Sequence, residues 1–429
     1  MSSRGSARRV ALTAVRRITE DRAYSNIVIP ALLADAGLDR RDRAFASELA
    51  YGTVRRLLPL DHAIASAASR PVARITPGAL AALRLGAYQV LFTDVAPHAA
   101  VGETVGLAAA RERGFVNAVL RRLVASPPLP PEGVDDPSIA IRTGLAPWAV
   151  AELRRLLGDE TEEAASSLAG PGALSLRVNT CRASREQVMG GLREHGYEPS
   201  VGAVDADCVL LRGGDPAVLP GFQEGWFTVQ DQASAFVVKV LDPQPGERIW
   251  DACAAPGGKT SAIACAVGDE GFVVASDLHP RRVERIREQA TRLGVRAAVL
   301  AHDAGRPALA GPFDRVLVDA PCSGIGAARR RPELLWRPRR QDLSTLARLQ
   351  VSIASAAAEL VRPGGRLVFA VCTFPRAETD AAADALLRHR PDLRPVEADG
   401  PGGPALRHRL WPHRHGSDGM FVAAFERER

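Results

Sequence analysis

Lysine is nearly absent from this 429-residue sequence: Lys239 and Lys259 are the only lysines among 55 basic residues, and the others are arginine. We attribute this bias to a GC-rich genome. A lysine that persists in such a chain is a candidate for a specific task. The net charge of +6 and a pI near 9.3 are compatible with a nucleic-acid partner.

Long apolar runs are also missing. No run reaches the ~18 residues that a membrane span needs, and the first nine residues are polar and basic, unlike a signal peptide. The sequence therefore predicts a cytoplasmic protein that does not enter a membrane. With 46% hydrophobic and 24% charged residues, its composition is that of a globular protein.

The six cysteines include no Cys-x-x-Cys pair, and no histidine pair accompanies them at zinc spacing. We therefore expect no metal site, and we expect no disulfide framework in a cytosolic chain. Most single cysteines pack as small buried hydrophobes. That role is expected for Cys181, Cys208, Cys253 and Cys265.

Three regions of the chain differ in their patterns. Residues 1–127 have apolar residues at helical spacing and predict an all-α bundle. A stiff linker is predicted over residues 128–140, because four prolines between Ser126 and Gly133 cannot continue a helix. Residues 141–234 predict a small α+β domain, with helices at 146–157 and 184–195 and strands at 174–179, 208–212 and 226–230.

From residue 235 to residue 429, near-continuous apolar strands alternate with helices. This alternation predicts a parallel sheet with helices on both faces. The expected strands are residues 248–251, 272–277, 297–301, 315–319 and 366–371, followed by a last strand at 420–425.

A glycine-rich turn, Asp251-Ala-Cys-Ala-Ala-Pro-Gly-Gly-Lys-Thr260, follows the first of these strands. Gly257 and Gly258 let the backbone approach a ligand, at the strand end where such sheets bind their ligands. The spacing differs from that of a phosphate loop, so an ATP site is not predicted. A tight turn without any ligand is the simpler alternative.

Acidic residues end the next two strands. Asp277 could accept hydrogen bonds from ribose hydroxyls, and Asp303 could bind an adenine amino group. One such acid is often only a helix cap. Three acids at successive strand ends, counting Asp251, instead favour a neutral or cationic nucleoside ligand.

Two cysteines also end strands at this edge: Cys322 in Asp319-Ala-Pro-Cys-Ser-Gly324, and Cys372 in Ala370-Val-Cys-Thr-Phe374. A thiolate that adds to carbon 6 of cytosine lets carbon 5 attack the methyl group of S-adenosylmethionine. The carbon 5 proton must then leave and the thiolate be expelled, with help from a second group acting as general base or proton relay. Asp319 could hydrogen-bond the N3/N4 edge of the ring.

These three segments, in this order and at this spacing, resemble the RNA cytosine-5 methyltransferase family. Further matching segments are Gln230–Ser234, Arg331–Trp336 and Asp418–Phe421. The resemblance implies a Rossmann-like class I methyltransferase domain at residues 235–429, with S-adenosyl-L-methionine as cofactor.

The same resemblance implies that Cys372 is the nucleophile, that Cys322 promotes product release and that Asp319 is catalytic. The positions implied to hold the cofactor or the target base are Ala254, Ala255, Pro256, Gly257, Gly258, Lys259, Asp277, Arg282, Asp303 and Asp319. The chain departs from the family pattern at Ala370-Val371, usually Ser-Thr, and at Leu335, commonly a lysine.

The helical region resembles the NusB-type RNA-binding domain, through Arg43–Val54, Leu83–Val90 and Phe115–Leu123. This domain joined to this methyltransferase is the arrangement of the RsmB (Sun, Fmu) family, which methylates one cytosine of small-subunit (16S) ribosomal RNA. Arg8, Arg9, Arg16 and Arg17 favour RNA contact by the helical region. A spacer that only packs on the catalytic domain is the alternative, and we expect a monomer.

Other functions remain open from the sequence. The same chemistry could act on transfer RNA, or an inactive methyltransferase domain could serve as an RNA-binding ribosome-assembly factor. Pro321-Cys322 also fits DNA cytosine methyltransferases, although Cys372 would then have no purpose. Thiol attack needs the base out of its stack, so we expect an unpaired loop or end as the target.

Overall fold

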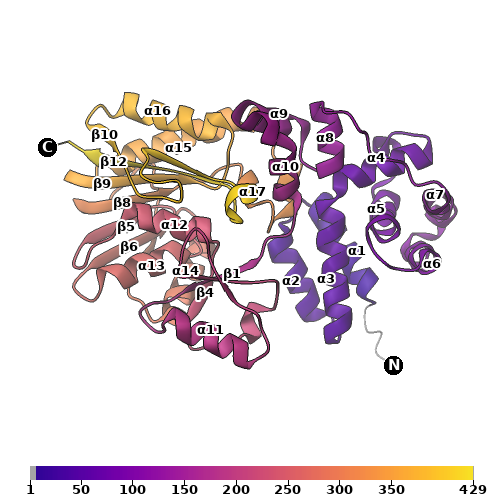
Figure 1. Ribbon diagram of the computed structural model, residues 1–429, viewed down its shortest axis with the longest axis horizontal. Helices are drawn as coiled ribbons and strands as arrows, with labels where there is room; N and C mark the ends of the chain where they lie inside the picture. The colour runs from indigo at the N-terminus through magenta and orange to yellow at the C-terminus, as the bar shows by residue number, and fades with distance from the viewer. Residues whose placement is uncertain (1–5, 429) are drawn as a thin grey trace. The chain divides into compact units, whose positions relative to one another are not determined.

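The computed structural model describes residues 6–428. The predicted domains 1–127 and 235–429 therefore each extend beyond the described residues, by residues 1–5 and by residue 429. The chain forms two compact units (Figure 1). The first contains the residues up to Gly170 together with 328–338. The second contains residues 171–327 and 339–429.

The first unit is helical. Its helices are α1 (Ala7–Thr19), α2 (Ser25–Asp35), α3 (Arg40–Arg55), α4 (Leu57–Ala68), α5 (Pro77–Phe92), α6 (Pro97–Leu107), α7 (Arg113–Ala125), α8 (Asp136–Thr143), α9 (Pro147–Leu157) and α10 (Thr161–Ala169). Proline at the first helical position starts α5, α6 and α9, where its missing N–H costs nothing. Among the described residues, no helix is long and apolar enough to cross a membrane.

The core of this bundle follows the predicted helical spacing. Ala11, Ala14, Val15 and Ile18 form the buried face of α1. Gly52 on α3 faces Tyr88 on α5 so closely that a Cβ atom would lie 2.0 Å from the tyrosine ring. The predicted all-α bundle is confirmed.

Residues 328–338 are distant in sequence but belong to the first unit. The carboxylate of Glu333, in the 3-10 turn Pro332–Leu335, is buried and accepts a hydrogen bond from Ser25 Oγ at 2.6 Å. Trp336 packs against the helical core and donates from Nε1 to Val54 O at 3.0 Å. Arg337 donates to the carbonyls of Ile18 and Ala23. This segment therefore completes the helical unit.

The second unit begins with a small antiparallel sheet in the order β2-β3-β1-β4. Its strands are β1 (Leu174–Val178), β2 (Ser200–Val201), β3 (Cys208–Leu211) and β4 (Phe227–Val229). Helix α11 (Arg185–Glu194) starts with a capping box between Ser184 and Gln187 and packs Val188 and Leu192 against the sheet. The predicted α+β character of this region is confirmed, although β2 was not predicted.

The large sheet has the order β10-β12-β9-β8-β5-β6-β7, with β11 paired to β12 (Figure 1). The strands are β5 (Arg248–Asp251), β6 (Phe272–Asp277), β7 (Ala298–Ala301), β8 (Phe313–Asp319), β9 (Val361–Val371), β10 (Leu393–Val396), β11 (Arg407–Leu410) and β12 (Met420–Arg427). Strands β5 to β9 pair in parallel, and β12 runs antiparallel to β9. The predicted parallel sheet is confirmed.

Helices cover both faces of this sheet, and neighbouring strand residues alternate between the two cores. The helices are α12 (Gln232–Leu241), α13 (Gly258–Val267), α14 (Pro280–Leu293), α15 (Leu343–Ala358), α16 (Asp380–His389) and α17 (Pro412–His415). Ile249 packs with Ile263 of α13, whereas Trp250 packs with Ala354 of α15. Burial of each such large side chain contributes about 1.5–3 kcal/mol, so the strand ends that carry the candidate site are firmly placed.

A disulfide joins Cys181 to Cys265, with Cα atoms 5.7 Å apart. The expectation that both would be free, buried thiols was wrong. Cys181 is exposed in the turn after β1, and Cys265 lies on α13. They meet because the small sheet packs on α13, a contact between segments 84 residues apart that spacing cannot reveal.

Candidate active site

The parallel register brings the predicted strand-end residues to one edge of the large sheet. Asp251 on β5 is paired with Leu317 on β8, and Asp319 on β8 is paired with Ala370 on β9. Asp277 ends β6, which runs parallel to β5. Since carboxyl ends of parallel strands share an edge, the acids and the two cysteines gather where such sheets bind ligands.

The glycine turn is shaped by its backbone. Gly257 has a φ of +102°, and a Cβ atom there would lie 3.2 Å from the Cα atom of Ile286 on α14. Only glycine satisfies both conditions without strain. Ala254 N donates to Ser276 O at 2.8 Å, which ties the turn to β6. The peptide bond between Ala255 and Pro256 is cis.

Asp251 is fully buried beneath this turn. Its Oδ2 accepts a hydrogen bond from Thr260 Oγ1 at 2.7 Å, whereas Oδ1 has no partner among the described protein atoms. Burial raises the pKa of Asp251 to about 7, against the opposing effects of Thr260 and Lys259. An unpartnered buried acceptor costs free energy, so Oδ1 is suited to receive a donor from a bound ligand.

Lys259 and Asp319 form an ion pair. Lys259 Nζ lies 2.6 Å from Asp319 Oδ2, and the lysine side chain is one-tenth exposed. Burial lowers the pKa of Lys259, but Asp319 outweighs it, with smaller contributions from Asp251 and Cys372, so the pKa is raised overall. Lys259, one of two lysines in this arginine-rich chain, is thus protonated and lies inside the predicted site.

The two predicted catalytic cysteines lie together. The Sγ atoms of Cys322 and Cys372 are 3.4 Å apart, and both residues are partly buried. The pKa of Cys322 is raised, first by its hydrogen bond with Cys372 and then by burial. Cys322 therefore holds its proton at neutral pH. Cys208 is buried as expected, and Cys253 is partly buried.

Asp277 and Asp303 have local contacts as well. Asp277 is almost fully buried; its Oδ1 accepts from His279 N at 3.1 Å, and Oδ2 lies 3.3 Å from Arg282 Nη2. Asp303 is exposed, and its Oδ1 accepts from Gly305 N at 2.9 Å. The contact with His279 uses only Oδ1 of Asp277. Oδ2 contacts the exposed side chain of Arg282, which a ligand could displace.

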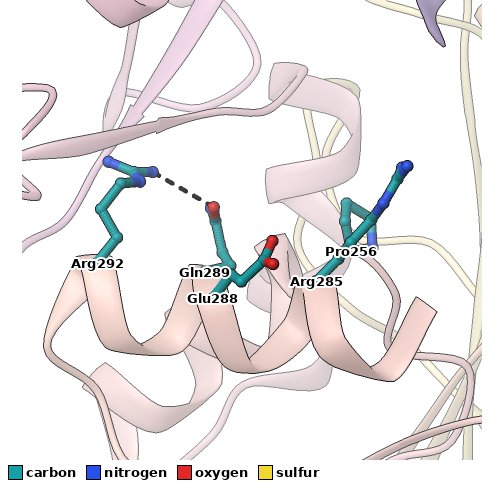
Figure 2. Close-up of a pocket in the computed structure, with 5 residues that line it drawn as sticks. All are labelled: Pro256, Arg285, Glu288, Gln289 and Arg292. Carbon is teal, nitrogen blue, oxygen red and sulfur yellow. Dashed lines mark hydrogen bonds between the residues drawn. The ribbon is translucent and has the colours of Figure 1, made fainter. Parts of the chain in front are cut away.

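A hollow of about 360 Å³ lies beside the glycine turn but apart from the thiols. Figure 2 shows its lining, which consists of Arg285, Glu288, Gln289 and Arg292 on α14 and of Pro256 in the glycine turn. Of the predicted site residues only Pro256 takes part. Arg292 donates to the carbonyl of Phe222 at 2.8 Å, so this side chain has a structural role. The hollow is not the centre of the predicted chemistry.

Two buried charged residues near the site, Arg177 and Glu378, were not predicted from the sequence. Arg177 on β1 donates to Ser261 Oγ and Gln230 Oε1, both at 2.7 Å, which braces the start of α13; burial lowers its pKa to about 10. Glu378 accepts hydrogen bonds from Ser323, next to Cys322. A charge inside an otherwise uncharged strand, Leu174-Ser-Leu-Arg-Val178, is the signal that could have identified Arg177.

The secondary matching segments are placed as well. Asp231 Oδ1 caps α12 by accepting from Ala233 N, and it also accepts from Asp418 N at 2.9 Å, so segments 230–234 and 418–421 meet. Leu335, at the position that is commonly a lysine, is fully buried in the first unit. A leucine there cannot make the polar substrate contact that the resemblance implies.

Comparison with known proteins identifies the family of the chain. A family model described as 16S rRNA methyltransferase RsmB/F matches residues 238–426, a NusB family model matches 5–125, and a ferredoxin-like domain of RsmF/B-like methyltransferases matches 146–217. Ribosomal RNA small subunit methyltransferase B of Salmonella arizonae is 34% identical over 99% of each chain. The chain belongs to the RsmB/F family.

Two further proteins are similar to this RsmB/F protein over nearly its whole length. The Mycobacterium tuberculosis protein Rv1407, named as a methyltransferase without a substrate, is 39% identical over 98% of this chain and 96% of its own length. The crystal structure of PH0851 has a TM-score of 0.86 at 28% identity and covers 98% of both chains. The predicted family, the multi-domain fold class and the enzyme class, an S-adenosylmethionine-dependent RNA cytosine-5 methyltransferase, are confirmed.

Proposed function

We propose that this RsmB/F protein methylates carbon 5 of a cytosine in 16S ribosomal RNA through a covalent bond between Cys372 and carbon 6. The observation that carries the proposal is the pair of thiols 3.4 Å apart at the ends of neighbouring strands, beside the Lys259–Asp319 ion pair. Relatives named for the small-subunit RNA support the target.

The residues of the sheet edge fit S-adenosylmethionine, which supplies an electrophilic methyl group when bound. Gly257 and Gly258 would let the backbone pass close to it, and Asp251 Oδ1 would gain the donor that it lacks. Asp277 would accept from its ribose and Asp303 from its adenine. A cationic sulfonium is favoured near several carboxylates.

In the proposed reaction, the Cys372 thiolate adds to carbon 6 and carbon 5 becomes nucleophilic. Asp319 accepts a hydrogen bond from the exocyclic amine of the cytosine, while Lys259 holds the carboxylate in place. After methyl transfer the carbon 5 proton passes to water, the C5–C6 double bond re-forms, and the bond to Cys372 breaks. The protonated Cys322 thiol donates a hydrogen bond to the departing sulfur.

The helical unit would add RNA affinity through its phosphate contacts. Arg9 and Arg17 on α1 are exposed, whereas Arg16 pairs with Glu20 at 3.0 Å and Arg8 donates to Gln89 at 2.7 Å. We therefore assign RNA contact to Arg9 and Arg17 rather than to all four arginines. The protein would act as a monomer in the cytoplasm.

Bisulfite sequencing tests the whole proposal. RNA from a strain that lacks the protein is treated with purified protein and S-adenosylmethionine. One new 5-methylcytosine in small-subunit RNA is expected. A new site in transfer RNA would keep the chemistry and refute the target. If no site appears and Cys322→Ala forms no covalent adduct with ribosomal RNA, the proposed chemistry is refuted.

A further inference from the structure

We propose that Glu378 is a positioning residue that sets the approach of Cys322 to Cys372 and thereby controls release of the methylated RNA. The inference rests on the proposed roles of the two cysteines. Glu378 lies in the short 3-10 turn Arg376–Glu378, which follows β9 and Cys372 in the chain. It does not contact the thiols directly; its partners are the residues beside them.

The Glu378 carboxylate is fully buried, with 0% of the residue exposed. Its Oε1 accepts hydrogen bonds from Ser323 N and from Gln350 Nε2, both at 2.9 Å. Its Oε2 accepts from Ser323 Oγ at 2.5 Å. None of these donors, all within the described part of the chain, is cationic, and burial raises the pKa of Glu378 despite them.

A buried carboxylate without a cation is costly, and a stable fold does not require one. Such a group is therefore a candidate for a task in the site. The positions of its two hydrogen-bond donors, Ser323 and Gln350, indicate what Glu378 does. Ser323 follows Cys322 directly, and Gln350 Nε2 also donates to the carbonyl of Pro321, which precedes Cys322. Glu378 thus fixes the chain on both sides of the thiol.

The same network reaches the other cysteine. Ser323 Oγ lies 2.7 Å from Thr373 Oγ1, and Thr373 follows Cys372 at the end of β9. Because the Ser323 hydroxyl donates its hydrogen bond to Glu378, the serine oxygen is oriented to accept one from Thr373. One carboxylate therefore links the segments that carry both thiols, and the 3.4 Å separation of the two sulfurs depends on it.

Release is the step that depends most on this separation. When the bond between carbon 6 and Cys372 Sγ breaks, its electron pair stays on that sulfur, and the carbon 5 proton has passed to water. The Cys322 thiol stabilises the departing thiolate only within hydrogen-bond reach. A displacement of about 1 Å in an active site can reduce a rate roughly 100-fold.

The test measures formation and release of the RNA adduct separately. Glu378→Ala and Glu378→Gln proteins are mixed with ribosomal RNA and S-adenosylmethionine, and adduct is followed on denaturing gels. We expect adduct to accumulate and turnover to fall roughly 10- to 100-fold with alanine. Glutamine, which keeps one acceptor oxygen, should lose less. Affinity for S-adenosylmethionine should stay within twofold.

A second variant separates positioning from general damage. In Cys322→Ala protein, the added Glu378→Gln change should leave the amount of adduct unchanged, because the group that Glu378 positions is already gone. A further fall in adduct would show that Glu378 supports the nucleophile or the fold and would overturn the inference. Normal release by Glu378→Ala would overturn it too.

The first unit supplies a matched control. Glu333 is also fully buried and accepts from the amide and the hydroxyl of one serine, Ser25. Glu333 belongs to the first unit and, unlike Glu378, has a cation nearby, Arg331 Nε at 3.9 Å. Glu333→Gln therefore removes a buried carboxylate outside the Ser323–Gln350 network and should not change the ratio of adduct formation to release. If Cys322→Ala itself gives no adduct, the proposed function fails; if only the Glu378 variants behave normally, this inference alone fails.

Discussion

Lys259 Nζ and Asp319 Oδ2 are 2.6 Å apart, and the ammonium group lies in a site that also contains Asp251 and Cys372. We predict that Lys259→Met lowers kcat/KM for RNA methylation roughly 100-fold, because one hydrogen bond between charged groups contributes about 1.5–3 kcal/mol. Single-turnover methylation measures this. Lys239→Met is the control and should leave kcat/KM nearly unchanged, because this half-exposed lysine pairs with the buried Asp205, outside the site. Equal losses in both variants would refute the role of Lys259.

The two thiols should give opposite phenotypes. Cys372→Ala should abolish turnover and any protein–RNA adduct, whereas Cys322→Ala should accumulate an adduct seen as a slow band on a denaturing gel. The reason is that, in the proposed reaction, one sulfur forms the bond and the other helps it to break. Identical behaviour of the two variants would contradict this division. Methylation lost only with Cys322→Ala would instead point to the DNA methyltransferase arrangement.

Asp251 makes stability depend on pH. Its pKa is about 7 in the folded protein and 3.8 in the unfolded reference, so the folded state holds the proton more tightly. The contribution of this proton to the free energy of unfolding is complete below about pH 4. It is lost as the pH rises to 7, because the free energy of unfolding falls by up to roughly 1.4 kcal/mol per pH unit. Denaturant unfolding of wild type and Asp251→Asn between pH 5 and 8 measures it. The free-energy difference between them should change across this window; a constant difference would contradict the prediction.

The disulfide between Cys181 and Cys265 closes a long loop, which restricts the unfolded chain. We predict that Cys181→Ser lowers the free energy of unfolding by about 2–5 kcal/mol. A reductant should destabilise the wild-type protein and leave the variant unchanged in thermal unfolding. Cys208→Ser, which removes a free buried thiol, should keep the response to reductant. A wild-type protein indifferent to reductant would show that the bond does not contribute.

Much of the second unit was predictable because each parallel strand carries its own apolar signal. The ends of β5, β6, β8 and β9 then follow from topology alone, and so does the meeting of Asp319 with the two cysteines. Strands β2, β10 and β11 were missed since short strands near a sheet edge have little apolar pattern. The predicted domain borders at 127, 140 and 234 remain predictions.

Contacts between distant segments could not be predicted. Glu378 looks like an ordinary surface residue in the sequence, and only the fold shows that it is buried. The pairing of Cys181 with Cys265 depends on how the small sheet packs on α13. Trp336 lies in the helical core because residues 328–338 belong to the first unit, whereas the residues before and after them belong to the second.

That last feature affects how the protein is made. Residues 328–338 belong to the helical unit, so its core is incomplete until a ribosome has translated most of the chain. Until then, the surface that later receives Trp336 and Glu333 is open, and a chaperone has time to bind it. No single cut in the gene would yield two self-sufficient halves. The helical and methyltransferase parts must therefore be inherited together.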